Sequence, residues 1–399
     1  MRIAVIGAGV VGASVARELA TRGADRTEVT VFEQWHPGSG TSASTFAWVN
    51  SNEKRPDSYH RLNVAGCEEH RRLATDLAGT PRWYFPTGNL AWACDPGDRT
   101  ELEDRVARLD RLGYPYRWIE PAELTDLEPD IRPPNAVDRV AFFPSEGYVQ
   151  PALLLARLLG EAVDRGVRLR HPVTVRALEP RANGVDVVLA DAERLRFDRV
   201  VCCAGRSTEG LAATVGARIP LHHDGAAGSG VADSRPAGSG HGGASAGLLA
   251  TTDPVPARLS RVLTTPELNV RPDGGGRLLM HAPDLDTAVE ADPAELAERH
   301  GDGDVARLLR DRLAKRLART GDAAIATLRF GRRVLPADGL TVAGFADPNT
   351  RRCYVVATHS GVTLGPLLGR LTAGEVLDST EAPQLAGYRP DRFDTAAGS

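Results

Sequence analysis

The sequence predicts an α/β fold, and three observations lead to that class. The chain opens with an apolar strand at Arg2–Ile6, a glycine-rich turn and an amphipathic helix that runs to about Ala20. A second apolar strand at Glu28–Phe32 ends in an acid, Glu33. Strand and helix patterns alternate again in the middle of the chain and at its C-terminal end. Together these patterns predict a parallel sheet that is covered by helices.

Gly7, Gly9 and Gly12 form the first turn, with the spacing G-x-G-x-x-G. In this pattern the first glycine permits the tight turn, the second lets a pyrophosphate approach the backbone, and the third permits close helix–strand packing. The N-terminus of the helix offers free N–H groups to that pyrophosphate. Glu33 follows Gly12 by about 20 residues, where a carboxylate binds ribose hydroxyls and repels a 2′-phosphate. The unit therefore predicts a Rossmann-like domain for NAD or FAD and disfavours NADP.

The bulk composition excludes several classes of partner. The chain has 399 residues, enough for two domains, with 42% hydrophobic and 25% charged residues, as in ordinary soluble proteins. A net charge of −4 and a pI near 6.2 argue against nucleic acid or an anionic membrane as a partner. We identify no signal peptide and no apolar run of membrane-spanning length, so we expect a cytoplasmic protein.

The cysteines and histidines do not predict a metal site or a disulfide framework. The cysteines are odd in number and lack C-x-x-C or zinc-type spacing; they are Cys67, Cys94, Cys202, Cys203 and Cys353. Cys202 and Cys203 lie in an apolar strand and are expected to be buried. His222 and His223 are adjacent on an expected strand, so their side chains point to opposite faces and bind no common metal.

The remaining elements follow from hydrophobic periodicity and turn residues. We expect helices at Tyr59–Leu77, Arg99–Leu112 and Asp292–Thr320. Residues 167–201 have the pattern of strands, and the Ala204-Gly205 turn that follows them is expected at the carboxyl edge of the sheet, where ligands bind. An Asp-Gly-Gly-Gly turn at 273–276 predicts a hairpin. Residues 224–247 are rich in Gly, Ser and Ala, which favours a flexible loop or lid.

Several segments occur in a fixed order over nearly the whole chain: "VIGAGVVGASVARELA" with Glu33, "TGNLAWA", "EPAELTDLEP", "EGYVQPALLLARLL", "VVCCAGRST", "GRRVLPADGLTVAG" and "YVVATHSGVTLGPLLGRLTAGEVL". This pattern resembles the glycine oxidase, sarcosine oxidase and D-amino acid oxidase family of FAD-dependent amine oxidoreductases. The first segment is shared with many dinucleotide enzymes, whereas the C-terminal pair is more specific. The resemblance implies FAD as the cofactor. It is expected to bind non-covalently, because "RRVLPADG" lacks the cysteine that attaches the flavin in sarcosine oxidases.

The resemblance also implies the domain division and the cofactor contacts. An FAD-binding domain is expected from residues 1–83, 145–215 and 331–399, and a mixed-sheet α+β substrate-binding domain from 84–144 and 216–330. By the resemblance, the ADP portion is held by Gly7, Gly9, Val10, Val11, Gly12 and Glu33, and the adenine is contacted by Val173. Ala204 and Gly205 lie below the ribityl-pyrophosphate, Ser42, Ala43, Ser44, Thr45 and Phe46 lie beside the flavin, and Gly361, Val362, Thr363 and Leu364 face its pyrimidine end. Further expected cofactor contacts are Gln34, Cys203, Gly331, His359 and Ser360.

Two basic residues are candidate catalytic groups. By the resemblance, Arg333 aligns with the arginine that binds the substrate carboxylate, a task that suits the guanidinium fork; the alternative is a structural salt bridge beside Arg332. Lys54 is the only lysine in the first three hundred residues and follows the flavin-facing loop. We expect it to activate oxygen or contact the substrate, and the alternative is an ordinary solvated lysine.

Three further side chains are expected near the flavin. His359 comes directly before the last glycine turn, where a substrate contact and a structural histidine are both consistent with the sequence. Trp48 and Tyr148 are candidates for an aromatic substrate pocket, although packing in the core explains them equally well.

Departures from the family pattern bear on the substrate. Sarcosine oxidases place a lysine for the carboxylate in the final glycine-rich turn, where this chain has "GVTLGP". Glycine oxidases carry a second arginine after the histidine of that turn, where Ser360 and Gly361 follow His359 here. With one carboxylate anchor missing, an amine group on a larger molecule, admitted past the 224–247 loop, becomes a candidate substrate alongside a simple amino acid.

We therefore expect an FAD-dependent oxidase. It converts the C–N bond of an amino acid or amine to an imine and reduces O2 to hydrogen peroxide. The substrate is glycine- or sarcosine-like, or an aminoacyl or amine group of a larger metabolite. An FAD-dependent amine dehydrogenase with a non-oxygen acceptor, a non-catalytic flavin-binding module and an NAD enzyme are the alternatives. The expected partners are the small amine and O2, and the oligomeric state stays open.

Overall fold

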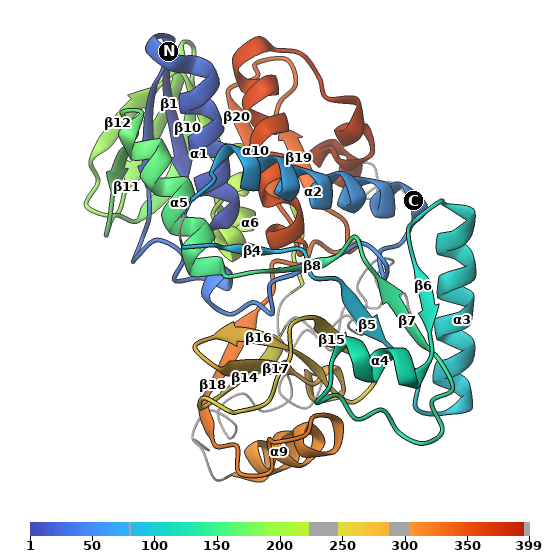
Figure 1. Cartoon of the computed structure of the whole chain (residues 1–399). Coiled ribbons are helices and arrows are strands. Elements are labelled where there is room, and N and C mark those ends of the chain that lie inside the picture. The colour runs from blue at the N-terminus through green and yellow to red at the C-terminus, as the bar shows by residue number, and fades with distance from the viewer. Residues whose placement is uncertain (80, 223–245, 287–302, 395–399) are drawn as a thin grey trace.

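Two large sheets, one of six strands and one of eight, organise the computed structural model (Figure 1). The structure describes residues 1–79, 81–222, 246–286 and 303–394. The mixed α/β class predicted from the sequence is confirmed. The six-stranded sheet lies in the upper part of Figure 1 and the eight-stranded sheet in the lower part, with helices on the outer faces of both.

The six-stranded sheet contains the predicted βαβ unit at its centre. Its order is β19 (Val342–Phe345), β20 (Cys353–Ala357), β13 (Arg199–Cys202), β1 (Arg2–Ile6), β2 (Glu28–Phe32) and β9 (Arg168–Arg170). All neighbours are parallel except β19, which is antiparallel to β20. The central strands are continuous apolar runs because both faces of the sheet are covered.

Alternate residues of β1 face two different layers. Ile3 and Val5 pack with the helices α1 (Val10–Gly23) and α10 (Gly361–Asp378). Ala4 and Ile6 pack with α6 (Thr208–Ala213) and with an antiparallel sheet of three strands, β10 (Val175–Arg181), β11 (Gly184–Leu189) and β12 (Arg194–Phe197). This division follows from the two-residue period of a strand.

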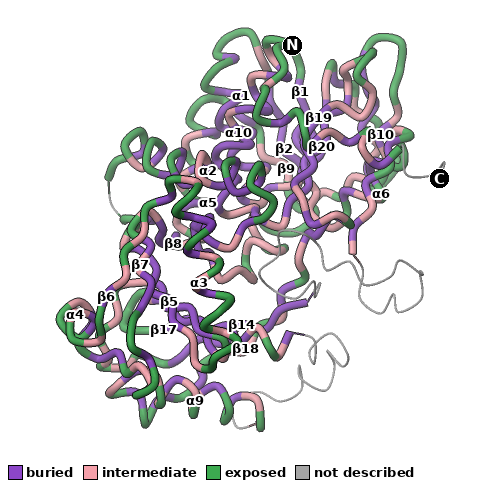
Figure 2. Tube along the Cα trace, turned by 90° about the vertical axis from the view of Figure 1, so that its right-hand side faces the viewer, coloured by how far each residue is buried: buried purple, intermediate pink, exposed green. Residues whose placement is uncertain are grey.

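Two glycines of α10 bring it unusually close to α1. A Cβ built on Gly365 would lie 2.9 Å from Cγ1 of Val10, and one built on Gly369 would lie 2.7 Å from the carbonyl carbon of Ser14. The first and last helices of the sheet domain therefore pack backbone to backbone. Helices α2 (Asp57–Asp76) and α5 (Pro151–Asp164) flank this pair, and in Figure 2 the buried trace concentrates around it.

The eight-stranded sheet has helices on both faces. Its order is β18 (Ile325–Arg332), β14 (Ala246–Thr252), β17 (Arg277–His281), β16 (Asn269–Gly274), β15 (Val262–Thr264), β5 (Asn89–Ala91), β7 (Val140–Phe143) and β6 (Arg117–Ile119). Helix α3 (Pro96–Arg111) packs on one face, and α4 (Pro121–Leu127) and α9 (Asp304–Arg316) pack on the other. The predicted hairpin is confirmed as the β16–β17 pair.

A small sheet connects the two large ones. It consists of β3 (Trp48–Val49), β8 (Gly147–Val149) and β4 (Tyr84–Phe85). The six-stranded sheet takes strands from residues 2–32, 168–202 and 342–357, and the eight-stranded sheet takes them from 89–143 and 246–332. We keep the division into 1–83, 145–215, 331–399 and 84–144, 216–330 as a proposal, with β18 passing the 330 boundary by two residues.

The structure corrects several expected boundaries. The helix expected at 292–320 ends at Arg316, because the extended backbone of Leu317 forms a β-bridge with Ile131; residues 292–302 lie outside the described part. Of the loop expected at 224–247, residues 246 and 247 belong to the buried strand β14, and 224–245 lie outside the described residues. The last helix begins at Gly361, two residues before the expected Thr363.

His222 follows a single bridge residue and is not in a strand, while His223 lies outside the described residues. All five cysteines are free, and Cys202 and Cys203 are buried as predicted. No helix in the ranges that the structure describes has the length and apolar character needed to cross a membrane.

Replacing Gly369 by alanine is expected to destabilise the protein by about 2 kcal/mol, because the added methyl group overlaps the backbone of α1. Denaturant unfolding monitored by circular dichroism measures this. Gly374→Ala in the same helix is the control. Its Cβ would meet only the end of the Arg22 side chain, at 3.4 Å, so we expect no loss, or a gain of up to about 1 kcal/mol from helix propensity. Equal losses in both variants would contradict this account.

Because of His70, we predict that the contact between α2 and α10 weakens at acidic pH. Its Nε2–H donates to the carbonyl of Val362 at 2.8 Å, and burial lowers the pKa of His70 to about 4. Between pH 6.5 and pH 4, His70 is therefore protonated in the unfolded chain and neutral in the folded chain. From pH 7 to pH 5 this histidine removes about 2 kcal/mol from the free energy of unfolding. His70→Asn should reduce that loss, whereas His171→Asn, at an exposed site, should leave it unchanged; equal pH slopes in wild type and His70→Asn would contradict the assignment.

Candidate active site

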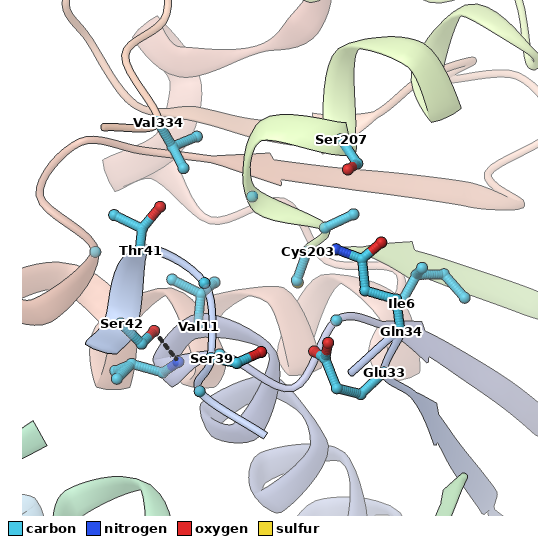
Figure 3. Close-up of a pocket in the computed structure, with 18 of the residues that line it drawn as sticks. Ile6, Val11, Glu33, Gln34, Ser39, Thr41, Ser42, Cys203, Ser207 and Val334 are labelled. Atoms are coloured by element: carbon cyan, nitrogen blue, oxygen red, sulfur yellow. Dashed lines mark hydrogen bonds between the residues drawn. The ribbon is translucent and has the colours of Figure 1, made fainter. Parts of the chain in front are cut away.

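A cavity of about 550 Å³ lies at the carboxyl edge of the six-stranded sheet. Its walls come from the ends of β1, β2, β13 and β20 and from the N-termini of α1 and α10. Figure 3 shows part of this lining, with Glu33, Gln34 and Cys203 on one side and Thr41, Ser42 and Val334 on the other. We call it the larger cavity. Its position is the one where open α/β sheets bind ligands.

The glycine turn forms the floor of the larger cavity because side chains do not fit there. Gly7 has a φ of +100°, and a Cβ on it would lie 2.4 Å from the carbonyl oxygen of Cys203. A Cβ on Gly12 would lie 2.0 Å from the carbonyl oxygen of Gly7. A Cβ on Gly9 would face Ser42 Oγ at 3.0 Å, and that oxygen accepts the N–H of Val10 at 3.1 Å (Figure 3).

Glu33 presents its carboxylate to the same cavity at the end of β2. One oxygen accepts the N–H of Ala8 at 2.9 Å and the other accepts the N–H of Trp35 at 3.1 Å. Two neutral backbone donors leave lone pairs for ribose hydroxyls. Val173 also lines the cavity, and its own N–H is used by the carbonyl of Glu33 at 2.7 Å.

The donor set fits a dinucleotide. A glycine cradle at a helix N-terminus accommodates a pyrophosphate, and an acid at the end of the second strand suits a ribose. The larger cavity shares Thr41, Thr45, His359 and Val362 with a second cavity of about 120 Å³. A long ligand can therefore extend from one into the other. We call the second one the smaller cavity.

Most of the predicted cofactor residues line one of these two cavities. The larger cavity is lined by Gly7, Gly9, Val10, Val11, Glu33, Gln34, Ser42, Val173, Cys203, Ala204 and Gly205, the smaller one by Ser44, Phe46, Gly331, Ser360 and Thr363, and Gly361 and the residues shared by both complete the set. Three predicted residues line neither. Gly12 packs against Gly7, Leu364 is buried in the core, and Ala43 faces a neighbouring cavity on the other side of its loop.

The smaller cavity brings together the predicted catalytic side chains. Lys54, Arg333, His359 and Trp48 all line it. Trp48 belongs to β3, Lys54 follows that strand, Arg333 directly follows β18 and His359 lies in the turn before α10, so segments far apart in the sequence meet there. Tyr148 does not line it: its ring stacks on Phe85 at 4.8 Å, behind Trp48, and gives it a packing role.

Lys54 is a buried cation, with 6% of its surface exposed. Its backbone N–H donates to the carbonyl of Ser51 at 3.1 Å. In the part of the chain that the structure describes, its ammonium makes no hydrogen bond or ion pair with another residue. Burying an unpaired charge of this kind costs folding free energy, and a bound ligand that pairs with the charge would offset that cost.

Arg333 already holds a carboxylate. Its guanidinium donates to Asp286 Oδ2 at 2.5 Å and to the carbonyl of Ala246 at 2.8 Å. Burial opposes ionisation of Asp286, but the hydrogen bonds and charges of His281 and Arg333 outweigh it and lower the pKa of Asp286. The expected substrate clamp is thus a neutralised pair in this structure, and a substrate carboxylate would compete with Asp286 for it.

Two histidines complete the wall of the smaller cavity. His281 Nε2 lies 2.9 Å from Asp286 Oδ2, and its Nδ1 lies 3.3 Å from the side-chain nitrogen of Asn269. Burial and the charges of Lys54 and Arg333 lower the pKa of His359 well below its ordinary value. His359 is therefore a neutral group at neutral pH.

Sequence reasoning missed several functional residues. His281 and Asp286 belong to no motif, because their pairing depends on how β17 turns into the segment that follows. Asn50 and Leu249 line the smaller cavity without a recognisable signal. Glu146 lies inside the quoted segment "EGYVQPALLLARLL" but was given no role, although it accepts the Nε1–H of Trp48 at 3.1 Å.

Comparison with known proteins agrees with this geometry. The model of the FAD dependent oxidoreductase family, DAO, matches residues 2–375. Glycine oxidase of Geobacillus kaustophilus is 24% identical over 395 residues, covering 97% of this chain and 95% of that protein. The 4-methylaminobutanoate oxidase (formaldehyde-forming) of Paenarthrobacter nicotinovorans is 27% identical over 222 residues, which are 56% of this chain and 26% of that protein. The chain thus spans about a quarter of the length of this second relative.

The fold is similar to that of a solved structure. The crystal structure of the glycine oxidase from Geobacillus kaustophilus superposes with a TM-score of 0.78 and 21% identity, covering 98% of this chain and 99% of that one. The family match extends over nearly the whole chain and includes both cavities. The chain belongs to the DAO family of FAD-dependent oxidoreductases.

Proposed function

We propose that this enzyme is an oxidase of C–N bonds in amino acids or small amines that passes the electrons to molecular oxygen. The amine loses two electrons and two protons and becomes an imine, which water hydrolyses to a carbonyl compound and a free amine. O2 takes up the two electrons and two protons and becomes hydrogen peroxide. FAD, when bound, accepts the hydride and returns the electrons to oxygen. The observation that carries the proposal is the buried Lys54 in the smaller cavity, whose ammonium has no partner among the described residues.

The residues of the larger cavity would hold the cofactor. Glu33 suits the ribose and the turn at Gly7–Gly12 suits the pyrophosphate, while the N-terminus of α10 offers N–H groups towards the region shared with the smaller cavity. We propose non-covalent attachment. Among the described residues, Cys203 is the only cysteine that lines either cavity, and its pKa is raised well above the ordinary value by burial, which disfavours the reactive thiolate.

The charges of the smaller cavity favour a neutral amine. None of the described residues that line it is a carboxylate, and Asp286 behind the wall neutralises Arg333. The ammonium of Lys54 therefore disfavours a second positive charge on the bound amine. A substrate that enters as the free base has the nitrogen lone pair that imine formation requires. The neutral His359 adds no further charge.

The same cation suits reaction with oxygen. O2 acquires negative charge as it is reduced, and a positioned ammonium in a water-poor site stabilises that charge. This use of the Lys54 cation favours an oxidase over a dehydrogenase with a different acceptor. The proposed substrate is a small amine such as glycine or sarcosine, or the amine-bearing end of a longer molecule.

Anaerobic titration with amines tests this function directly. Glycine, sarcosine, D-amino acids and larger amine-bearing metabolites are added one class at a time while the flavin absorption is recorded, and air is admitted last. We expect bleaching by at least one amine, then rapid recovery with one equivalent of peroxide. Recovery that needs an added electron acceptor instead of air would establish a dehydrogenase and contradict the oxidase.

Replacing Lys54 by methionine is expected to slow the reaction of the reduced enzyme with O2 by about 100-fold, because the cation that stabilises charge on oxygen is lost. Stopped-flow mixing of photoreduced enzyme with aerated buffer measures this rate without any substrate. Lys315→Met removes the chain's other lysine, at an exposed site on α9, and should leave the rate unchanged. Equal rates in the wild type and in Lys54→Met would show that Lys54 takes no part in the reaction with oxygen.

A further inference from the structure

We propose that Glu146 is a positioning residue that places Lys54 in the smaller cavity. This inference rests on the proposed function, because it assigns Glu146 an effect on the reaction with oxygen that is transmitted through Lys54. Glu146 lies between β7 and β8, is completely buried and lines neither cavity. The side-chain hydrogen bonds of Glu146 join it to residues 48–52, which lead to Lys54, and to Tyr114.

The carboxylate of Glu146 receives five hydrogen bonds. Oε1 accepts the N–H of Ser51 at 2.9 Å, the N–H of Asn52 at 2.8 Å and the hydroxyl of Tyr114 at 2.8 Å. Oε2 accepts the side-chain amide of Asn52 at 2.8 Å and the indole N–H of Trp48 at 3.1 Å. Four of the five donors thus belong to residues 48–52, directly before Lys54.

An ionised carboxylate is the group that this arrangement requires. It has two acceptor oxygens and no donor, whereas an amide has one of each kind. In a glutamine at this position, the NH₂ group would replace one of the two oxygens. It would then face either the three donors at Oε1 or the two donors at Oε2. Burial raises the pKa of Glu146 to about 6, against the effect of the hydrogen bonds, so the carboxylate is mostly ionised at neutral pH.

Other contacts complete the frame that holds this segment. Arg108 of α3 donates to the carbonyl of Asn52 at 3.1 Å, and Arg105 donates to its side-chain oxygen at 3.2 Å. The hydroxyl of Ser51 donates to the carbonyl of His60 at 2.8 Å. The N–H of Lys54 then closes a turn onto the carbonyl of Ser51 at 3.1 Å. Because Ser51 and Asn52 are fixed by Glu146, the direction in which Lys54 leaves this turn is fixed as well.

The arrangement also fixes a wall of the cavity. Trp48 and Asn50 both line the smaller cavity, and the indole of Trp48 is one of the five donors. Tyr114 lies between α3 and β6, so Glu146 joins the eight-stranded sheet region to the segment that carries Lys54. A displacement of about 1 Å at such a site is enough to lower a rate by a large factor.

The test uses photoreduced holoenzyme and the rate of its reaction with O2. We expect Glu146→Gln to keep bound FAD and to lower this rate by about tenfold or more, because the amide repels donors of the 48–52 segment. In a Lys54→Met background the same substitution should change the rate by less than about twofold, since both act through one cation. Tyr114→Phe, which removes one donor of five, should lower the rate by a smaller factor in the same way, and it carries the test if Glu146→Gln does not fold.

Glu128→Gln is the matched control. Glu128 is another buried carboxylate, with 2% of its surface exposed, and it accepts hydrogen bonds from Ser260 and Arg261, away from both cavities. It should lose stability but leave the oxygen rate unchanged. The inference is overturned if Glu128→Gln lowers the rate as much as Glu146→Gln, if Glu146→Gln keeps the wild-type rate, or if its effect persists without Lys54.

Failure of the proposed function gives a different result. In that case the wild-type enzyme itself reacts slowly with O2 and Lys54→Met changes nothing, which overturns the oxidase proposal and this inference together. This inference alone is overturned if the reduced wild-type enzyme reacts fast with O2, the Lys54→Met variant reacts slowly, and the Glu146→Gln variant keeps the wild-type rate.

Discussion

The packing of α1 against α10 is the constraint on which the rest of the structure depends. Gly365 and Gly369 let the last helix approach the first at backbone distance, and no larger residue fits at either place. The contact joins the two ends of the described chain across the six-stranded sheet. Both helices then begin at the same edge of that sheet, so their N-terminal N–H groups converge on one cavity. The cavity that we propose to hold FAD therefore follows from the packing of these two helices.

Two carboxylates, Asp286 and Glu146, determine the charge and order of the smaller cavity. Asp286 pairs with Arg333 and cancels its charge, while Glu146 holds the segment that carries Lys54. The result is a site with one uncompensated cation among its described lining residues. This charge pattern differs from a two-cation clamp for a substrate carboxylate. It suits a neutral amine and a reaction that builds negative charge on oxygen.

Much of the fold was predictable because local patterns and long-range contacts agree in the βαβ unit. The sequence around Gly7 and Glu33 indicates its own strand, turn and helix, and the loop and turn residues that line the two cavities were expected from the family resemblance. The pairing of Arg333 with Asp286 was not predictable, since it depends on where β17 and β18 place residues that are far apart in the sequence. Tyr148 was expected in the pocket, but a stack on Phe85 holds it behind Trp48. Leu317 lies outside the predicted helix for a similar reason, because it forms an isolated β-bridge with the distant Ile131.

We propose that the two converging helices and the acid of β2 hold one FAD without a covalent bond. The visible spectrum of the purified protein, followed by denaturation, filtration and chromatography of the filtrate, tests this most directly. We predict flavin absorption bands in the native protein and one equivalent of FAD, free of the chain, in the filtrate. A protein without flavin, or a flavin that stays with the denatured chain, would contradict it.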